Sequence, residues 1–155
     1  FKKTGSQTTL LGKTLKGKTI IRTIEPKAFL AWQGIYENHQ IWNKFTDANG
    51  DPYVPIEPIE SYKLNKKGFV DVFSGVLDLS LDSWLQKTNN FHNWNEKLFK
   101  QRRKILDVLE EMGVSHGHTH DNNFCLRFFR DKDGKPDFYR VPRLYLIDFD
   151  MAISP

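Results

Sequence analysis

The strongest hydrophobic pattern in the chain lies between residues 95 and 112. Large apolar side chains recur there every three or four positions, which places them on one face of a helix. Gly113 follows directly, where a helix often ends in the left-handed conformation that glycine adopts most easily. We therefore predict a helix from Asn95 to Met112. The residues of its apolar face are Leu98, Ile105, Leu109 and Met112, with Phe99, Leu106 and Val108 beside them.

Two further apolar runs follow this helix. The runs are "NFCLRFF" and "RLYLIDF", and the charged segment between them, "RDKDGKPDFYRVP", contains glycine and proline. Short apolar runs separated by turn-forming residues are typical of paired strands. The pattern predicts a β-hairpin.

The first third of the chain combines strand and helix patterns. Residues 8–24 are rich in β-branched side chains and are interrupted by Gly12 and Gly17, which predicts strands joined by a tight turn. Pro26 suits the first turn of a helix, and apolar residues then recur at roughly helical spacing as far as Phe45. We therefore expect a hairpin that leads into a helix.

Turn signals dominate the middle of the chain. "DANGDPYVP" is a dense turn signal, and "YVPIEPIESY" can be at most an interrupted or edge strand, because proline lacks the N–H that a β-ladder needs. "GFVDVFSGVLDLSLDSWL" begins with strand-like alternation and turns helical near Ser80. This stretch predicts a strand, a connector and a short helix.

Composition bounds the class of protein. With 155 residues, 39% of them apolar, the chain has material for one ordinary domain or two very small lobes. The single cysteine, Cys125, cannot form an intrachain disulfide, and no run approaches the roughly 20 apolar residues that cross a bilayer. We expect a cytoplasmic protein with no membrane partner. The start at Phe1 rather than Met leaves open that the chain is a piece of a longer protein.

The formal net charge of +4 arises partly from one segment. Residues 2–22 carry several Lys and Arg side chains, and no acidic residue precedes Glu25. Such a segment can attract phosphate groups, or it can simply be a solvated surface. No zinc-finger spacing or aromatic-basic RNA motif accompanies the charge, so nucleic-acid binding is only a minor alternative.

The residues with the most distinctive chemistry follow the long helix. The stretch "GVSHGHTHDNNF" (113–124) places three of the five histidines at alternate positions. Phosphoryl transfer needs magnesium held against nucleotide phosphates, usually by a carboxylate and an amide. A hairpin would bring the start of its first strand close to the end of its second, so Asn123 and Asp148 could supply both ligands. We predict that these two residues form a magnesium site.

The order of helix, glycine, histidine-rich loop, hairpin and "DFD" resembles that of the protein kinase and aminoglycoside phosphotransferase superfamily. In that superfamily a loop of the form H-x-D-x-x-x-x-N is followed by a hairpin that carries D-F-G. His116, His118 and Asn123 have that spacing, and the triplet 148–150 stands where D-F-G is expected. "HGHTHDNNF" is most similar to the "HGDxHxxN" variant of small-molecule kinases.

This resemblance implies an α+β fold of the protein kinase-like, two-lobe type. A small antiparallel sheet plus one helix would form a nucleotide-binding lobe in residues 1–73. A hinge near Phe73 to Gly75 would connect it to a reduced or truncated helical lobe in residues 74–155, which contains the catalytic-type loop.

The resemblance also implies an activity and a set of site residues. The activity is transfer of the ATP γ-phosphate to a hydroxyl on a protein or small molecule, with Asn123 and Asp148 on magnesium and His118 at the catalytic position. Residues implied on the nucleotide side are Lys18 or Arg22 at the phosphates, Glu37 as the ion-pair partner of either cation, and Phe73 at the hinge.

Three departures from the superfamily pattern keep a second function open. The catalytic aspartate position is His118, the glycine of D-F-G is Asp150, and the chain stops at Pro155 before the later helices. A nucleotide-binding pseudokinase or scaffold without transfer is therefore the alternative. A short helical lobe would also leave apolar surface exposed, which favours a protein partner or self-association.

Two other classes match parts of the sequence. "GKTLKGKT" (12–19) fits the P-loop pattern G-x-x-x-x-G-K-[ST], although that loop must open into a helix and "TIIRTIEP" is β-branched. His116, His118 and His120, with Asp121 adjacent, could instead bind zinc or iron as in a metallohydrolase. That alternative leaves Asn123 and Asp148 without a role.

Overall fold

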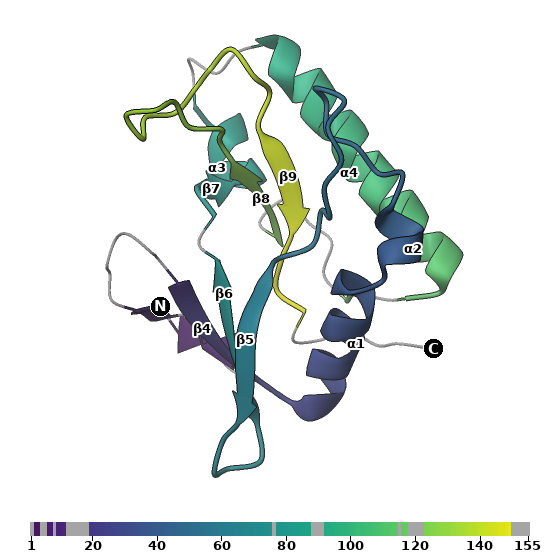
Figure 1. Cartoon of the computed structure of the whole chain (residues 1–155), viewed down its shortest axis with the longest axis vertical. Helices are drawn as coiled ribbons and strands as arrows, with labels where there is room; N and C mark the ends of the chain where they lie inside the picture. The colour runs from purple at the N-terminus through teal and green to yellow at the C-terminus, as the bar shows by residue number, and fades with distance from the viewer. Residues whose placement is uncertain are drawn as a thin grey trace.

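The structure is a computed structural model of the 155-residue chain, and it describes residues 2–3, 6–7, 9–11, 19–75, 77–87, 92–114, 116–117 and 123–149. These residues form a mixed α+β fold with small antiparallel sheets (Figure 1). The strands are β1 (Lys2–Lys3), β2 (Ser6–Gln7), β3 (Thr9–Leu11), β4 (Thr19–Ile24), β5 (Ile59–Leu64), β6 (Val70–Gly75), β7 (Leu79–Ser80), β8 (Phe124–Arg127) and β9 (Arg143–Leu146). The helices are α1 (Pro26–Tyr36), α2 (His39–Trp42), α3 (Leu81–Leu85) and α4 (His92–Met112).

The largest sheet has four antiparallel strands in the order β3-β4-β6-β5. The strands predicted within residues 8–24 are β3 and β4, and β6 pairs with β4 in the same sheet. β5, which follows the proline-containing segment, is an edge strand as expected. Directly after "GKTLKGKT" the chain forms strand β4 rather than the helix that a P-loop requires, so the P-loop alternative is wrong.

Helix α1 begins at Pro26 as predicted, but it ends at Tyr36, well before the predicted limit near Phe45. The chain then turns into α2, where the Asn38 side chain accepts a hydrogen bond from the N–H of Ile41 at 3.2 Å. Trp42 still packs in the core after this break. Apolar spacing alone therefore extended the predicted helix across a change of direction.

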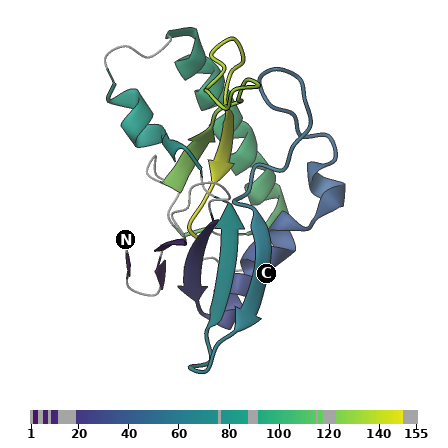
Figure 2. The ribbon, with the colours of Figure 1, turned by 60° about the vertical axis from the view of Figure 1, so that its left-hand side comes forward.

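The second main sheet has the order β7-β8-β9 and lies above the four-stranded sheet in Figures 1 and 2. The predicted hairpin is confirmed, because β8 and β9 are antiparallel with Phe124 opposite Leu146. The long helix is confirmed as α4 and runs along one side of the molecule. Gly113 has a φ of 70°, and the N–H of Val114 donates to the carbonyl of Leu109 at 3.1 Å, as in a left-handed helix end.

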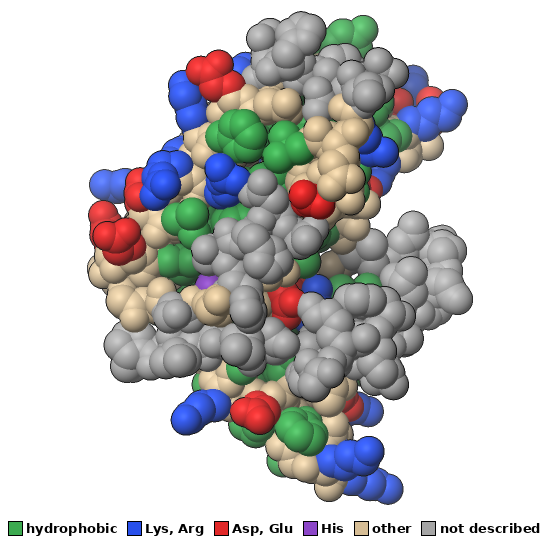
Figure 3. Space-filling model, turned by 180° about the vertical axis from the view of Figure 1, so that it is seen from behind, with side chains coloured by type: hydrophobic (Ala, Val, Ile, Leu, Met, Phe, Trp, Pro, Cys, Tyr) green, Lys and Arg blue, Asp and Glu red, His purple; other side chains and the backbone are tan. Residues whose placement is uncertain are grey.

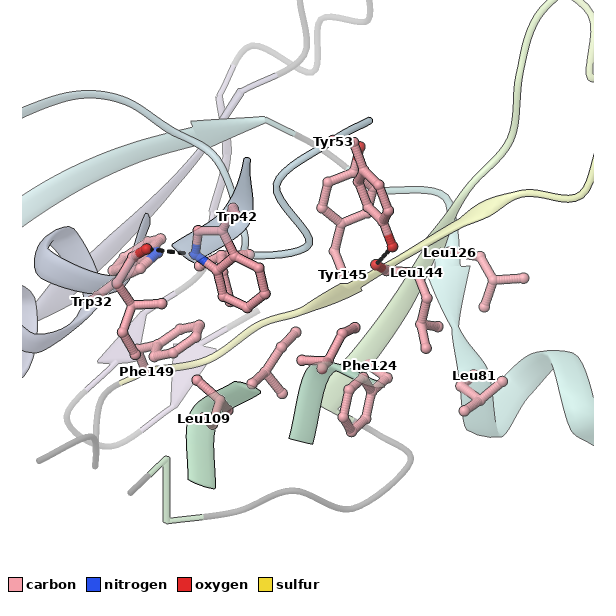
Figure 4. Packing of buried hydrophobic residues seen from close by; sticks show 14 of the residues in the cluster. Trp32, Trp42, Tyr53, Leu81, Leu109, Phe124, Leu126, Leu144, Tyr145 and Phe149 are labelled. Carbon is pink, nitrogen blue, oxygen red and sulfur yellow. Dashed lines mark hydrogen bonds between the residues drawn. The ribbon is translucent and has the colours of Figure 1, made fainter. Parts of the chain in front are cut away.

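A segment just before β5 joins the two sheets. The N–H of Leu146 donates to the carbonyl of Pro55, and the N–H of Glu57 donates to the carbonyl of Leu146, both at 2.9 Å. One hydrophobic core extends from α1 to α4 and β9; in Figure 4 it runs from Trp32 to Leu126. The division into residues 1–73 and 74–155 stays a prediction, and its boundary falls inside strand β6.

Within the described residues, no helix combines the length and the apolar character that crossing a membrane requires.

Candidate functional site

The structure brings Asn123 and Asp148 to the same end of the β8–β9 hairpin. Asn123 directly precedes β8, and Asp148 lies two residues after β9. The N–H of Ile147 donates to the Asn123 carbonyl at 2.8 Å, which extends the pairing of the two strands to this end. Both residues are only 7% exposed. Two residues with hard oxygen donors therefore lie at the same end of the hairpin, and both are largely shielded from solvent.

Asp148 has an unusual backbone. Its φ is 65°, in the left-handed region, where it is the only non-glycine residue among those described. Aspartate tolerates this region better than most residues, but the conformation still costs about 1 kcal/mol or more. The N–H of Asp148 donates to Oε1 of Glu57 at 3.2 Å, a charge-assisted contact that offsets this cost. The backbone of Asp148 is thus held by a contact outside the hairpin.

Two other rings pack against Phe149, which follows Asp148 in the chain. Trp32 from α1 stacks on Phe149 with ring centroids 5.9 Å apart and planes at 8° (Figure 4). His116 meets the same phenyl ring edge-on, with ring centroids 4.7 Å apart. His116 is buried, and its Nε2 donates to the carbonyl of Ile147 at 2.7 Å. The imidazole therefore braces the loop against the segment that carries Asp148.

The structure does not test the alternative in which the histidine cluster binds zinc or iron. His118, His120 and Asp121 lie outside the described residues, as do Lys18 and Asp150. Among the residues that the structure does describe, no three His, Cys, Asp or Glu side chains are grouped so that they could hold a metal ion. The catalytic role of His118 and the phosphate contact of Lys18 remain predictions.

Arg22 forms a buried ion pair, but not with the predicted partner. Its Nε donates to Oε2 of Glu57 at 2.7 Å, and the Ser74 hydroxyl donates to the same oxygen at 2.8 Å. Arg22 is 5% exposed and Glu57 is 1% exposed. The predicted partner, Glu37, is instead an exposed residue at the C-terminal end of α1. Local spacing could not identify Glu57, which is separated from Arg22 by 35 positions and enters through the segment bonded to β9.

The electrostatic surroundings keep Arg22 charged. Burial lowers the pKa of the Arg22 guanidinium, but the charge of Glu57 and its hydrogen bond raise it, and the negative charge of Asp148 adds to this, so that the pKa is raised overall. The same surroundings act on Cys125 in β8. Burial and the charge of Glu57 raise the pKa of the Cys125 thiol to about 12, although Arg22 opposes the shift. The thiol is therefore protonated at neutral pH, close to the Arg22–Glu57 pair.

Phe73 does not converge on this group of residues. In β6 the buried side chains of Val72 and Ser74 alternate with the half-buried Phe73, so Phe73 lies on the opposite face of the sheet from Ser74. Its neighbour across the sheet is Ile21, whereas Arg22 lies opposite Val72. The structure thus brings together Arg22, Asn123 and Asp148 of the predicted site and leaves Glu37 and Phe73 apart from them.

Comparisons with known proteins place the fold but not the function. No protein-family model and no curated protein matches the sequence. Solved structures do match: in one, a chain of the yeast RNA Pol II CTD kinase CTDK-1 complex, the similarity covers 99% of this chain and 44% of that chain, with a TM-score of 0.56 and 15% identity. The chain is therefore similar in fold to a component of a kinase complex. It spans less than half the length of that component.

Proposed function

We propose that this chain is a kinase-like phosphotransferase that moves the ATP γ-phosphate to a hydroxyl on a protein or small molecule. The four-stranded sheet and α1 would form a small lobe, and α3, α4 and the β7-β8-β9 sheet would form a reduced second lobe. The element order of the chain and the likeness to a component of a kinase complex support this arrangement.

The observation that carries the proposal is the position of Asn123 and Asp148 at the same end of the β8–β9 hairpin. Both residues are nearly buried, and Phe149, which follows Asp148 in the chain, packs against the His116 ring. Hard oxygen donors of this kind fit magnesium. When bound, magnesium would neutralise charge on the nucleotide phosphates. Asn123 and Asp148 would hold the ion and so fix the position of the phosphates.

Titration with ATP, with and without magnesium, tests this site. The wild-type chain should bind ATP more tightly when magnesium is present, and Asp148→Ala should abolish that magnesium dependence because a ligand carboxylate is lost. Asp107→Ala, which removes an exposed carboxylate of α4, is the matched control and should bind as the wild type does. Magnesium-dependent binding that survives in Asp148→Ala would refute the assignment.

Nucleotide binding without transfer is the second candidate. It is favoured by the burial of Arg22, which is held by Glu57, and by the histidine that replaces the usual catalytic aspartate at position 118. A neutral imidazole can accept a proton but does not supply the negative charge that orients a hydroxyl.

Variants at His118 separate the two candidates. If the chain transfers phosphate, the rate should rise through about pH 6 to 7, the ordinary range of imidazole titration. His118→Ala should lower the rate by about 10²-fold, and His118→Asp should preserve or raise it. ATP binding with no transfer by either the wild type or His118→Asp would favour the binding protein. Stoichiometric zinc that is lost together with activity in His118→Ala would favour the metallohydrolase instead.

A protein partner is compatible with both candidates. The similar chain comes from a complex, and large apolar side chains are exposed on this one, including Leu64 at 69% and Tyr139 at 100%. On the face shown in Figure 3, hydrophobic side chains are interspersed with charged ones. Sedimentation velocity over a range of concentrations would test self-association.

A further inference from the structure

We propose that Glu57 is a positioning residue that orients Asp148 for metal binding. The metal part of this inference rests on the proposed function, in which Asp148 holds magnesium. The orientation of the Asp148 backbone by Glu57 is a separate statement, and it can be tested without any ligand.

The carboxylate of Glu57 connects three segments that are far apart in the sequence. Its Oε2 accepts hydrogen bonds from Arg22 in β4 and Ser74 in β6, and its Oε1 accepts one from the N–H of Asp148 after β9. Glu57 is 1% exposed, so water does not compete for these contacts. One carboxylate thus joins the four-stranded sheet to the residue that would bind the metal.

The position of this carboxylate is itself fixed. The N–H of Glu57 donates to the carbonyl of Leu146 at 2.9 Å, and the indole N–H of Trp32 donates to the carbonyl of Glu57 at 3.0 Å. The backbone of Glu57 is therefore held by both β9 and α1. The Glu57 carboxylate therefore cannot shift with Asp148 if the Asp148 backbone moves, and its position stays constant.

The left-handed backbone conformation of Asp148 needs a hydrogen-bond acceptor in a fixed position. A φ of 65° directs the Asp148 side chain differently from the extended conformation of the preceding strand. The hydrogen bond from the Asp148 N–H to Oε1 of Glu57 favours this conformation. Without it, the carboxylate should sample other directions and bind a cation less tightly.

Glu57→Gln is the informative variant. Glutamine has nearly the same shape but only one oxygen, and its NH₂ group cannot accept a hydrogen bond. The single oxygen of glutamine cannot accept hydrogen bonds from both Arg22 and Ser74 and also from the N–H of Asp148. Asp71→Asn is the charge-matched control, because Asp71 accepts a hydrogen bond from Thr23 at 2.7 Å on the opposite face of the same sheet.

Amide hydrogen exchange provides the readout that does not depend on function. The Asp148 N–H should lose protection by about 10-fold in Glu57→Gln, the effect expected for one charge-assisted hydrogen bond. The N–H of Ile147, which donates to Asn123, is the internal reference: it reports the protection lost through destabilisation of the whole fold, and the 10-fold loss at Asp148 is counted beyond that. Both amides should be unaffected in Asp71→Asn. Unchanged protection at Asp148 in Glu57→Gln would overturn the proposal.

The second readout is the magnesium dependence of ATP affinity. In Glu57→Gln the magnesium concentration for half-maximal enhancement should rise by about 10-fold, while the affinity for ATP without magnesium should stay within about twofold. A merely structural defect would weaken both affinities, and equal weakening would count against positioning. If the wild type shows no magnesium-dependent binding, the proposed function fails, and amide exchange alone decides whether Glu57 orients Asp148.

A shorter side chain guards against loss of folding. If Glu57→Gln does not fold, Glu57→Asp keeps the charge that Arg22 requires but shortens the side chain by one methylene group. It should fold and still lose the protection of the Asp148 N–H. Retained protection in Glu57→Asp would refute the proposal.

Discussion

The buried ion pair between Arg22 and Glu57 gives the most quantitative test of the structure. Removing one member of a buried pair leaves the other charge without compensation and costs about 3 to 5 kcal/mol of the free energy of unfolding. Arg22 and Glu57 meet this condition, because their side chains are 6% and 1% exposed and their charged atoms are 2.7 Å apart. Arg22→Met should therefore lower the free energy of unfolding by about 3 kcal/mol or more. In a chain of this size that corresponds to a fall in melting temperature of about 6 to 12 °C.

A double-mutant cycle with urea denaturation isolates the pair. Glu57→Gln should also destabilise the fold, and the double variant should lose less than the sum of the two single losses, by about 2 kcal/mol. Arg103→Met is the control, since Arg103 and Asp107 in α4 are exposed and 3.7 Å apart. This variant should cost under about 0.5 kcal/mol. A loss in Arg22→Met as small as that of the control, or strict additivity in the cycle, would refute the buried pair.

Two other predictions follow from perturbed side chains. Burial raises the pKa of Asp47, but the hydrogen bonds from Arg143 and from two backbone N–H groups lower the pKa by more than burial raises it. The folded pKa therefore lies below the unfolded value of about 3.9. The charge of Asp47 therefore stabilises the fold above about pH 4 and ceases to do so as the pH falls through the lower folded pKa. Asp47→Asn should lower the free energy of unfolding by about 2 kcal/mol in urea denaturation at pH 7 and by progressively less toward pH 2. A loss that stays constant with pH would contradict the lowered pKa. With the pKa of Cys125 raised from 9.0 to about 12, the thiolate fraction at pH 8 is about 10³-fold below that of an ordinary cysteine. Maleimide should accordingly label the native chain at least that much more slowly than the urea-unfolded chain, and Glu57→Gln should speed labelling; equal rates in native and unfolded chains would contradict the buried, protonated thiol.

Local patterns predicted most of the secondary structure because each pattern depends on neighbouring residues. Pro26 and Gly113 mark helix ends through their own backbone preferences, and both predictions are confirmed. The β8–β9 hairpin follows equally from its two apolar runs and the turn between them. The predicted C-terminal limit of α1 was wrong. Trp42 and Phe45 belong to the core whether or not the helix continues to them, so their spacing could not reveal the turn before them.

The candidate site could likewise be predicted from the sequence only in part. The proximity of Asn123 and Asp148 follows from strand pairing, and strand pairing is visible in the sequence. The role of Glu57 is not visible, because its contacts with Arg22 and Asp148 bridge 35 and 91 positions. A signal did exist: Glu57 is an acidic residue directly after the apolar Ile56, in a segment too rich in proline for a central strand. Only the three-dimensional structure shows that this segment enters the interior.

The source of the carboxylate determines how rigid the proposed site is. Had Arg22 paired with a residue of α1, a shift of that helix could open and close the pair. Glu57 belongs instead to the segment bonded to β9, and Trp32 of α1 contacts both the Glu57 carbonyl and the Phe149 ring. Movement of α1 would therefore break the hydrogen bond and the ring stack together, while the pair of Arg22 and Glu57 would remain in place. On this geometry, the backbone next to the proposed metal ligands is organised before any ligand binds, which lowers the ordering cost of binding.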